Sequence, residues 1–504
     1  MKKIYYLLLI SVCLIMAQNA AAQDDGNAEN QTEKNTDNDL SGDITDPVNS
    51  VFESVFGYSK IGGNDVVGFR ISPVLRFGKF GMGLSVPVQW DLTNGNFRTD
   101  EFKGGVGVLR LVRFLSWGTK KVDPFYIRMG DINNAYLGLG NLIDNYSNAI
   151  SFDKRKVGIE ADIVIKQKFG FEFMYSDLDF SSFNLLGIRP YYRPFGDLDI
   201  PVVKTIEFGG TYVTDHDKTS VSTTDGSGKT NNLIGDGMNG FGFDLSMYLL
   251  KRKHTQIMVF AGYNRLMQIS GSDSLASYMQ MAGDAYEAEG DLATASLIKN
   301  YNDGDGWNYG VLFRFGFMEN FLRISTRLER LSYSDYYVPQ FFNTSYEISR
   351  DMRIAQLLTT EARQGTYGSL AFSLLDKITI GGDLMLPDNV CEEHPAMLQL
   401  NLNANDVIPK VICQGSYYKG QLANLKDALT FDNRSVAYLR LAYKFWNVMA
   451  VGFDYRWSFT RVETDNGEFT YEPKNYVSPY IGVSIPLFSN DKAESERKIS
   501  TDID

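Results

Sequence analysis

The sequence lacks long hydrophobic runs after its first 22 residues. A helix that crosses a bilayer needs about 20 consecutive apolar residues. The longest apolar run, Ile4–Ala17, follows Lys2 and Lys3 and precedes the small residues Ala20–Ala22. This layout is typical of a secretory signal peptide. We therefore expect residues 1–22 to be cleaved and the mature protein to be exported.

Cysteine and histidine are also scarce, with 3 of each in 504 residues. Only Cys391 and Cys413 follow the expected signal peptide. This excludes a disulfide-based scaffold but leaves open whether these two cysteines form one bridge. The histidines, His216, His254 and His394, have no repeated ligand spacing and no recognisable nucleophile beside them. We expect no metal site, no cofactor and no catalytic residues, and hence not an enzyme.

Positive charge is in deficit, since 49 Lys and Arg stand against 61 Asp and Glu, for a net charge of −12. A nucleic-acid partner is therefore not expected. Residues 23–48 contain eight acidic residues and a single lysine. A segment of this composition cannot bury enough apolar surface to fold, so it predicts a disordered acidic leader.

What the sequence does contain is alternation of apolar and polar residues. In VGFDYRWSF, residues 451–459, every second side chain is apolar and most are aromatic. Successive side chains of a strand point to opposite faces, so this pattern predicts a strand with one apolar wall. The same pattern recurs at 66–77, 82–90, 157–165, 169–175, 206–212, 241–249, 257–263, 311–317 and 322–329.

A soluble β-sandwich has the same period, but two features favour a membrane barrel. The strands expected around these alternating stretches run about 9 to 14 residues, which suits a tilted strand crossing a bilayer, whereas soluble strands average about 5 to 6. Short turns also alternate with long connections, of which the longest are 215–239, 266–306 and 334–365. The sequence therefore predicts an all-β, transmembrane, antiparallel up-and-down β-barrel over residues 66–488. We expect about 16 to 20 strands, with helical insertions in the long extracellular loops.

Both ends of the expected barrel carry further sequence signals. Residues 49–65 supply either an extra strand or a small plug. The last strand, YIGVSIPLF, resembles the β-signal through which the barrel assembly machinery recognises outer-membrane proteins. The residues that carry this resemblance are Gly482, Ile485, Leu487 and Phe488. It implies that machinery as a partner, although a polar tail at 489–504 follows the motif here.

In layout, residues 66–488 resemble the porin-like outer-membrane barrels of Gram-negative bacteria. The resemblance implies an outer-membrane location, contact with outer-membrane lipid, and a channel or transporter for small hydrophilic solutes. One alternative is a non-transporting scaffold, or an assembly or secretion partner, that contacts other envelope proteins. A second is a barrel for uptake of hydrophobic ligands, with residues 49–61 as a hatch.

Charged residues on the polar face of the strands are the candidates for lining the lumen. They are Arg70, Arg76, Glu160, Asp162, Glu207, Asp244, Arg314, Arg323, Arg327, Asp454 and Arg456. Their signs are mixed, so no strong ion preference follows. The irregular segment 132–150 is expected to be either a constriction inside the lumen or a surface loop. Helical spacing at 269–300 and 345–363 predicts insertions that either cover the barrel or fold into it.

Overall fold

The computed structural model describes most of residues 50–488. Outside the described part lie 1–49, 62–63, 98–110, 121–122, 133–134, 149–155, 167, 179–183, 217–218, 225–229, 236, 253, 269–279, 281–282, 285–286, 289, 291, 318–320, 344–345, 348–352, 354–356, 358–359, 376, 392–394, 406, 432–434, 447–448, 464–468 and 489–504. The expected signal peptide, acidic leader and polar tail therefore lie outside the described residues.

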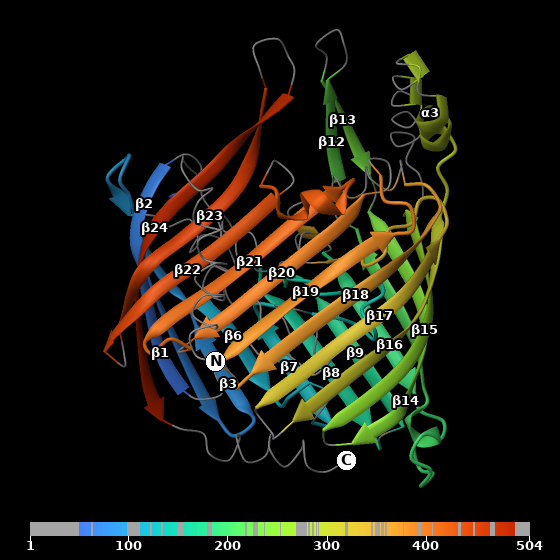
Figure 1. Ribbon diagram of the computed structural model, residues 1–504, viewed down its shortest axis with the longest axis horizontal. Coiled ribbons are helices and arrows are strands. Elements are labelled where there is room, and N and C mark those ends of the chain that lie inside the picture. Colours follow the sequence, from blue (N-terminus) through green and yellow to red (C-terminus); the bar gives the residue numbers. More distant parts are fainter. Residues whose placement is uncertain are drawn as a thin grey trace.

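The described elements are almost all strands (Figure 1). In the first half of the chain they are β1 (Ser50–Ile61), β2 (Asn64–Phe77), β3 (Phe80–Leu84), β4 (Val86–Asp91), β5 (Asn96–Phe97), β6 (Val112–Trp117), β7 (Phe125–Gly130), β8 (Gly158–Ile165), β9 (Phe169–Tyr175), β10 (Leu186–Tyr192), the 3₁₀ helix η4 (Val203–Thr205), β11 (Glu207–Asp215), β12 (Thr219–Thr224), β13 (Thr230–Gly235) and β14 (Met238–Arg252). The second half contains β15 (Thr255–Gln268), the helix α3 (Leu292–Lys299), β16 (Gly304–Phe317), β17 (Leu322–Tyr333), β18 (Arg363–Leu374), β19 (Ile378–Pro387), β20 (Ala396–Asn405), β21 (Val411–Leu422), the 3₁₀ helix η5 (Leu425–Leu429), β22 (Ser435–Trp446), β23 (Met449–Glu463) and β24 (Phe469–Phe488).

Strand pairing is antiparallel and returns to its starting point. β1 pairs with β2 on one edge and with β24 on the other. β3 and β4 are two parts of one strand, because both pair with β2, and the short β5 pairs only with β4. Counted this way, the 22-stranded sheet forms a ring of 20 strands within the described part of the chain. The predicted up-and-down barrel is confirmed, and residues 50–61 lie in its wall.

The outer face of the ring is apolar. Residues paired across neighbouring strands share a face, so the exposed apolar side chains can be followed around the sheet. They include Phe171, Phe243, Trp307, Leu328, Leu370 and Phe453. An exposed apolar surface of this extent fits contact with lipid rather than with water.

The two ends of the barrel differ in their connections. Short turns such as Gly78–Lys79 join neighbouring strands at one end, where a positive φ of 56° at Gly78 suits the tight reversal. At the other end the hairpin β12–β13 and the helix α3 project beyond the ring (Figure 1). The connections expected to be long at 215–239 and 266–306 contain these two elements. None of the described helices is long and apolar enough to cross a membrane.

Leu328 tests which face meets lipid. It lies near the middle of β17, is 56% exposed, and neighbours the inward-facing Arg327. We expect Leu328→Arg to lower the free energy of unfolding by about 2–4 kcal/mol, the cost of an arginine on the lipid face near the bilayer midplane. Urea unfolding in lipid vesicles measures this, with Leu328→Met as the control. Equal stability of the two variants would contradict a lipid-facing position.

Candidate functional site in the barrel lumen

The segment 135–148, between β7 and β8, lies inside the barrel. Its adjacent residues Gly138 and Leu139 contact strands on separate parts of the ring. The amide N–H of Gly138 donates to Glu172 of β9 at 2.9 Å, and Arg327 of β17 donates to the carbonyl of Leu139 at 2.7 Å. Only a segment that crosses the lumen reaches both strands. Residues 132–150 were expected to form either a constriction inside the lumen or a surface loop. The described residues 135–148 form the constriction.

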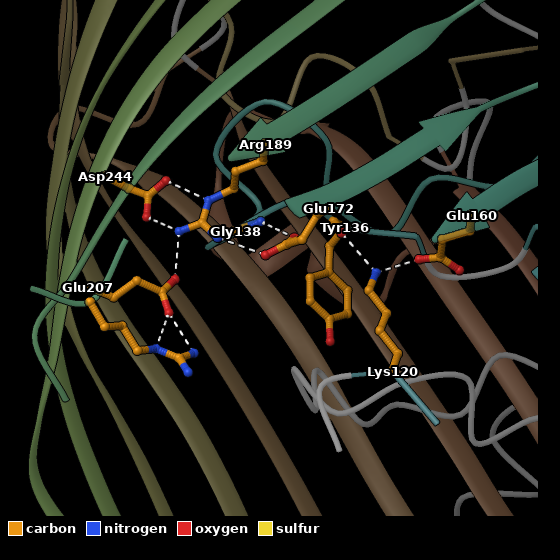
Figure 2. A network of polar contacts seen from close by, with 9 residues as sticks. Lys120, Tyr136, Gly138, Glu160, Glu172, Arg189, Glu207 and Asp244 are labelled. Atoms are coloured by element: carbon orange, nitrogen blue, oxygen red, sulfur yellow. Dashed lines mark hydrogen bonds and ion pairs between the residues drawn. The ribbon is translucent and has the colours of Figure 1, made fainter. Parts of the chain in front are cut away.

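A buried ionic cluster lies on the wall formed by β9, β10, β11 and β14, beside the segment 135–148 (Figure 2). The Arg189 side chain on β10 is 1% exposed. It donates to Glu172 at 2.7 Å, to Asp244 of β14 at 2.9 Å and to Glu207 of β11 at 2.8 Å. Arg193 donates to the second carboxylate oxygen of Glu207 at 2.7 Å. Three carboxylates from three strands thus share two guanidinium groups.

Glycine lets the inner segment rest directly on this cluster. Gly138 has a φ of 58°, in the region that favours glycine. A Cβ atom there would overlap the Arg189 guanidinium, and so would a Cβ atom at Gly209 on β11. The backbone of the segment can therefore approach the cluster closely enough for the bond from Gly138 to Glu172.

Two further cations hold the segment by its backbone. Lys120, between β6 and β7, is 3% exposed, forms an ion pair with Glu160 and donates to the Tyr136 carbonyl at 3.0 Å (Figure 2). Its ammonium group also lies 4.2 Å from the centre of the Tyr136 ring. Arg327 supplies the other anchor, through the carbonyl of Leu139. The charged wall positions are thus used to fix a loop in the lumen.

A second segment, which includes Phe341, Phe342 and Tyr346, packs inside the barrel beside the segment 135–148. The N–H of Phe342 donates to the Leu142 carbonyl at 3.0 Å, and the N–H of Asp144 donates to the Phe342 carbonyl at 3.2 Å. Apolar side chains of both segments pack against inner residues of β9, β11, β14 and β15. The buried cluster comprises Ile132, Ala135, Leu137, Leu142, Ile143, Tyr146, Met174, Leu185, Val213, Met238, Leu266, Tyr337, Phe341, Phe342, Tyr346 and Leu357. The insertion expected at 345–363 therefore folds into the barrel, as its described residues Tyr346 and Leu357 show.

The wall formed by β18–β21 has a different character. Arg327 pairs with Ser369, Ser369 with Asp383, Asp383 with Gln399, and Gln399 with Tyr418. These five residues form one transverse row across neighbouring strands. Besides Ala371, Gly381 and Ile412, the inner positions with described side chains from this row toward the end with short turns are Ser369, Ser373, Thr379, Asp383, Gln399, Asn401, Asn403, Gln414, Ser416 and Tyr418. Only one of these ten residues is charged. Amide and hydroxyl groups dominate this side of the lumen.

The next strands carry a closed ion pair. Arg440 of β22 binds Asp454 of β23 through two bonds of 2.6 Å. The guanidinium also lies 4.0 Å from the centre of the Tyr480 ring on β24. Asp454, in the stretch VGFDYRWSF, is thus neutralised within the wall, and its alternating neighbour Phe453 is 60% exposed on the outer face.

A cleft separates the segment 135–148 from β15–β19. Its lining includes Asn141, Asn264, Asn308, Glu329, Gln340 and Tyr367. Asn308 donates to Asn141 at 2.9 Å and to Glu329 at 2.6 Å, while Asn264 donates to Asn308 at 3.3 Å. Carboxamides therefore line the cleft on both its loop side and its strand side.

Nine of the eleven charged residues that the sequence proposed as lumen-lining have described side chains at inner positions. By register, the inner positions include Arg76, Glu160, Asp162, Glu207, Asp244, Arg314, Arg323, Arg327 and Asp454. Arg70 and Arg456 belong to β2 and β23, but their side chains lie outside the described part. In the proposed assembly signal, Gly482 pairs with Ala450 and Val55. The side chains of Ile485, Leu487 and Phe488 are not among those described, and recognition by the assembly machinery stays a prediction.

The organising residues of the site were not among those proposed from the sequence. Arg189 lies two positions after Gly187 and two before Tyr191, so the strand period does place it on the inner face. Pro190 obscures that period, because proline is rare within strands. Lys120 lies in a turn, where no periodicity could have found it.

The described part of the chain includes both cysteines that follow the expected signal peptide. No group of three or more His, Cys, Asp or Glu side chains there is arranged to hold a metal ion. Cys391 and Cys413 are not joined by a disulfide, and Cys413 is buried. The disulfide left open by the sequence is therefore absent between these two described residues.

Comparison with known proteins returns similar folds at low identity. No protein-family model matches the sequence, and no curated protein matches it. Among solved structures, OccK5 (OpdH) of Pseudomonas aeruginosa has 13% identity and a TM-score of 0.34, covering 87% of this chain and 98% of that one. OccK11 (OpdR) of the same species has 11% identity and a TM-score of 0.33, covering 87% and 96%. The outer membrane transporter YddB of Escherichia coli has 11% identity and a TM-score of 0.33, covering 87% and 81%. The chain resembles such barrels in architecture, and its own strand pairing establishes the fold.

Removing the Arg189 guanidinium should be costly. Arg189→Met leaves buried carboxylates without their main partner, so we expect the free energy of unfolding to fall by about 3–5 kcal/mol. Arg193→Met is the matched control, because Arg193 is 29% exposed and shares only Glu207; about 1 kcal/mol or less is expected. Urea unfolding in lipid vesicles compares them, and equal losses would count against a central role for Arg189.

Asp144, in the inner segment, should make that segment sensitive to pH. Burial raises the pKa of Asp144 to about 7, with Asp383 and Glu329 adding to the rise and Arg327 opposing it. The folded state thus favours the neutral carboxyl. Its contribution to stability is fully present below the ordinary value of 3.8 and is lost as the pH rises through about 7.

Hydrogen exchange of residues 135–148, corrected for intrinsic rates, should therefore show less protection at pH 8 than at pH 5.5. Asp144→Asn should abolish this difference because the amide does not titrate. A difference of the same size in the variant would assign the effect to another group.

Proposed function

We propose that the protein is an outer-membrane channel for small hydrophilic solutes, narrowed on one side by its inner segments. The observation that carries the proposal is the unequal use of the two walls. On the side of β8–β14, ion pairs and apolar packing hold the segment 135–148. On the side of β18–β21, polar side chains face the lumen, and Tyr418 remains 40% exposed there.

The size of the ring supports this proposal. Barrels of about 16–18 strands enclose an aqueous channel, whereas those of about 22 strands have a plugged lumen. A ring of 20 strands would be wide if empty. An inward segment that fills one side reduces it to a passage that can select among solutes.

The expected location follows from the same physics. A closed ring satisfies its backbone hydrogen bonds and presents an apolar outer face, as a bilayer requires. The expected signal peptide, with Lys2 and Lys3 before its apolar run, would direct export. We therefore propose insertion in the outer membrane, with its lipid as the surrounding partner.

One observation favours a second candidate function, a non-transporting scaffold or assembly partner. The buried cluster inside the lumen and the paired charges are features of a filled barrel. Uptake of hydrophobic ligands has less support. Residues 50–61, which that reading used as a hatch, form a wall strand, and amides line the described cleft.

Single-channel recording in a planar bilayer separates channel from scaffold. Refolded protein that shifts on gels when heated should give steady ohmic steps. Arg327→Met, which removes the anchor at Leu139, should give larger or noisier steps because the inner segment is less firmly held. Silence from well-folded protein in both cases would reject the channel and favour the scaffold.

A further inference from the structure

We infer that the solutes of this channel are neutral and rich in hydroxyl groups, as saccharides are. The inference rests on the proposed channel function and names its substrate class. It follows from the chemistry of the unfilled wall, β18–β21, and of the cleft above it.

The unfilled wall offers mainly uncharged hydrogen-bonding groups, with Asp383 as the one charged residue at the described inner positions from the row of Arg327 toward the short turns. Gln399, Asn401 and Gln414 occupy inner positions on neighbouring strands, and Ser416 pairs with Asn401 in register. A carboxamide both donates and accepts hydrogen bonds, and a hydroxyl group does the same. A polyhydroxylated solute therefore finds partners along this wall whichever way its hydroxyl groups point.

The charges near this wall are of both signs, with Asp383 on the wall itself and Arg353 beside Tyr418. Tyr367 donates to Asp383 at 3.1 Å, and the bidentate pair of Arg440 and Asp454 is closed. Charges of both signs give no strong field of one sign, so neither anions nor cations are strongly drawn into the passage. A charged solute would lose part of its hydration shell there among mainly uncharged groups.

An aromatic surface completes the lining. Tyr418 lies in the same transverse row as Gln399, on the inner face, and is 40% exposed. The face of an aromatic ring packs well against the apolar C–H face of a sugar ring, while the phenol hydroxyl remains able to hydrogen-bond. Amide groups beside an aromatic platform suit a solute with both kinds of surface.

The amide lining continues into the cleft beside the inner segment. Asn264 and Asn308 come from β15 and β16, and Asn141 from the segment 135–148. The lining of the cleft includes Tyr367, whose hydroxyl donates to Asp383 on β19 of the unfilled wall. Asn264 and Asn308 are buried and bonded within the cleft, whereas Asn401 and Asn403 on β20 are partly exposed at inner positions where a solute could reach them.

Swelling of proteoliposomes in isotonic solutes tests the inference. Glucose should enter at least about threefold faster than gluconate or glucosamine, which are similar in size but charged. The double variant Gln399→Leu, Asn401→Leu should slow glucose by at least about threefold, since one net hydrogen bond corresponds to roughly a 2–10-fold change. Its potassium chloride conductance should stay within about twofold of the unchanged protein. Asn300→Leu, an exposed amide after α3, is the matched control and should alter neither rate.

A second variant guards against misfolding. Gln399→Glu, Asn401→Asp keeps the side-chain shapes and should shift the reversal potential in a salt gradient toward cation selectivity. If the protein gives conductance steps but glucose and gluconate enter equally fast, the inference is wrong and the channel function is kept. The same holds if the reversal potential of the second variant is unchanged. Neither conductance nor swelling with any solute would overturn the channel itself and the inference with it.

Discussion

In lipid, no water is available to satisfy an unpaired backbone N–H or C=O group, so every strand of this chain needs a partner on both edges. The pairing of β1 with β24 meets that need by removing the last free edges of the sheet. Once the ring is closed, strict alternation assigns each side chain to lipid or to lumen. Aromatic and aliphatic residues such as Trp307 and Leu328 then cover the outside, and nearly all polar groups must be accommodated within.

Those inner polar groups are put to two uses. Around Arg189, carboxylates from β9, β11 and β14 and the cations Lys120 and Arg327 hold the backbone of the segment 135–148. Burying so many charges is tolerable only because each is paired and hydrogen-bonded. Across the lumen, the strands β18–β21 carry amides and hydroxyls in place of such clusters. The asymmetry is built into the wall, and the proposed channel function places the passage on the side of β18–β21.

The barrel could be predicted from the sequence because its main signal is local. Alternation over a segment such as 451–459 reports both the strand and its two faces. The site was harder to predict, because it depends on which inner residues meet across the ring. Glu207 and Asp244 were identifiable as inner residues, but nothing in the chain indicates that both bind Arg189. The position of the segment 132–150 likewise depends on anchors such as Lys120 that are distant in sequence from their partners, so sequence left constriction and surface loop as equal alternatives.

The central claim is that one side of the lumen is filled and the other is open. Cysteine accessibility in a planar bilayer tests it most directly, in a Cys391→Ser, Cys413→Ser background. Asn401→Cys on the open wall should react with a membrane-impermeant cationic thiosulfonate and lower the current. Met174→Cys, which lies beneath the inner segment, should be unreactive. Rapid reaction at both positions, or at Met174→Cys alone, would contradict this account of the lumen.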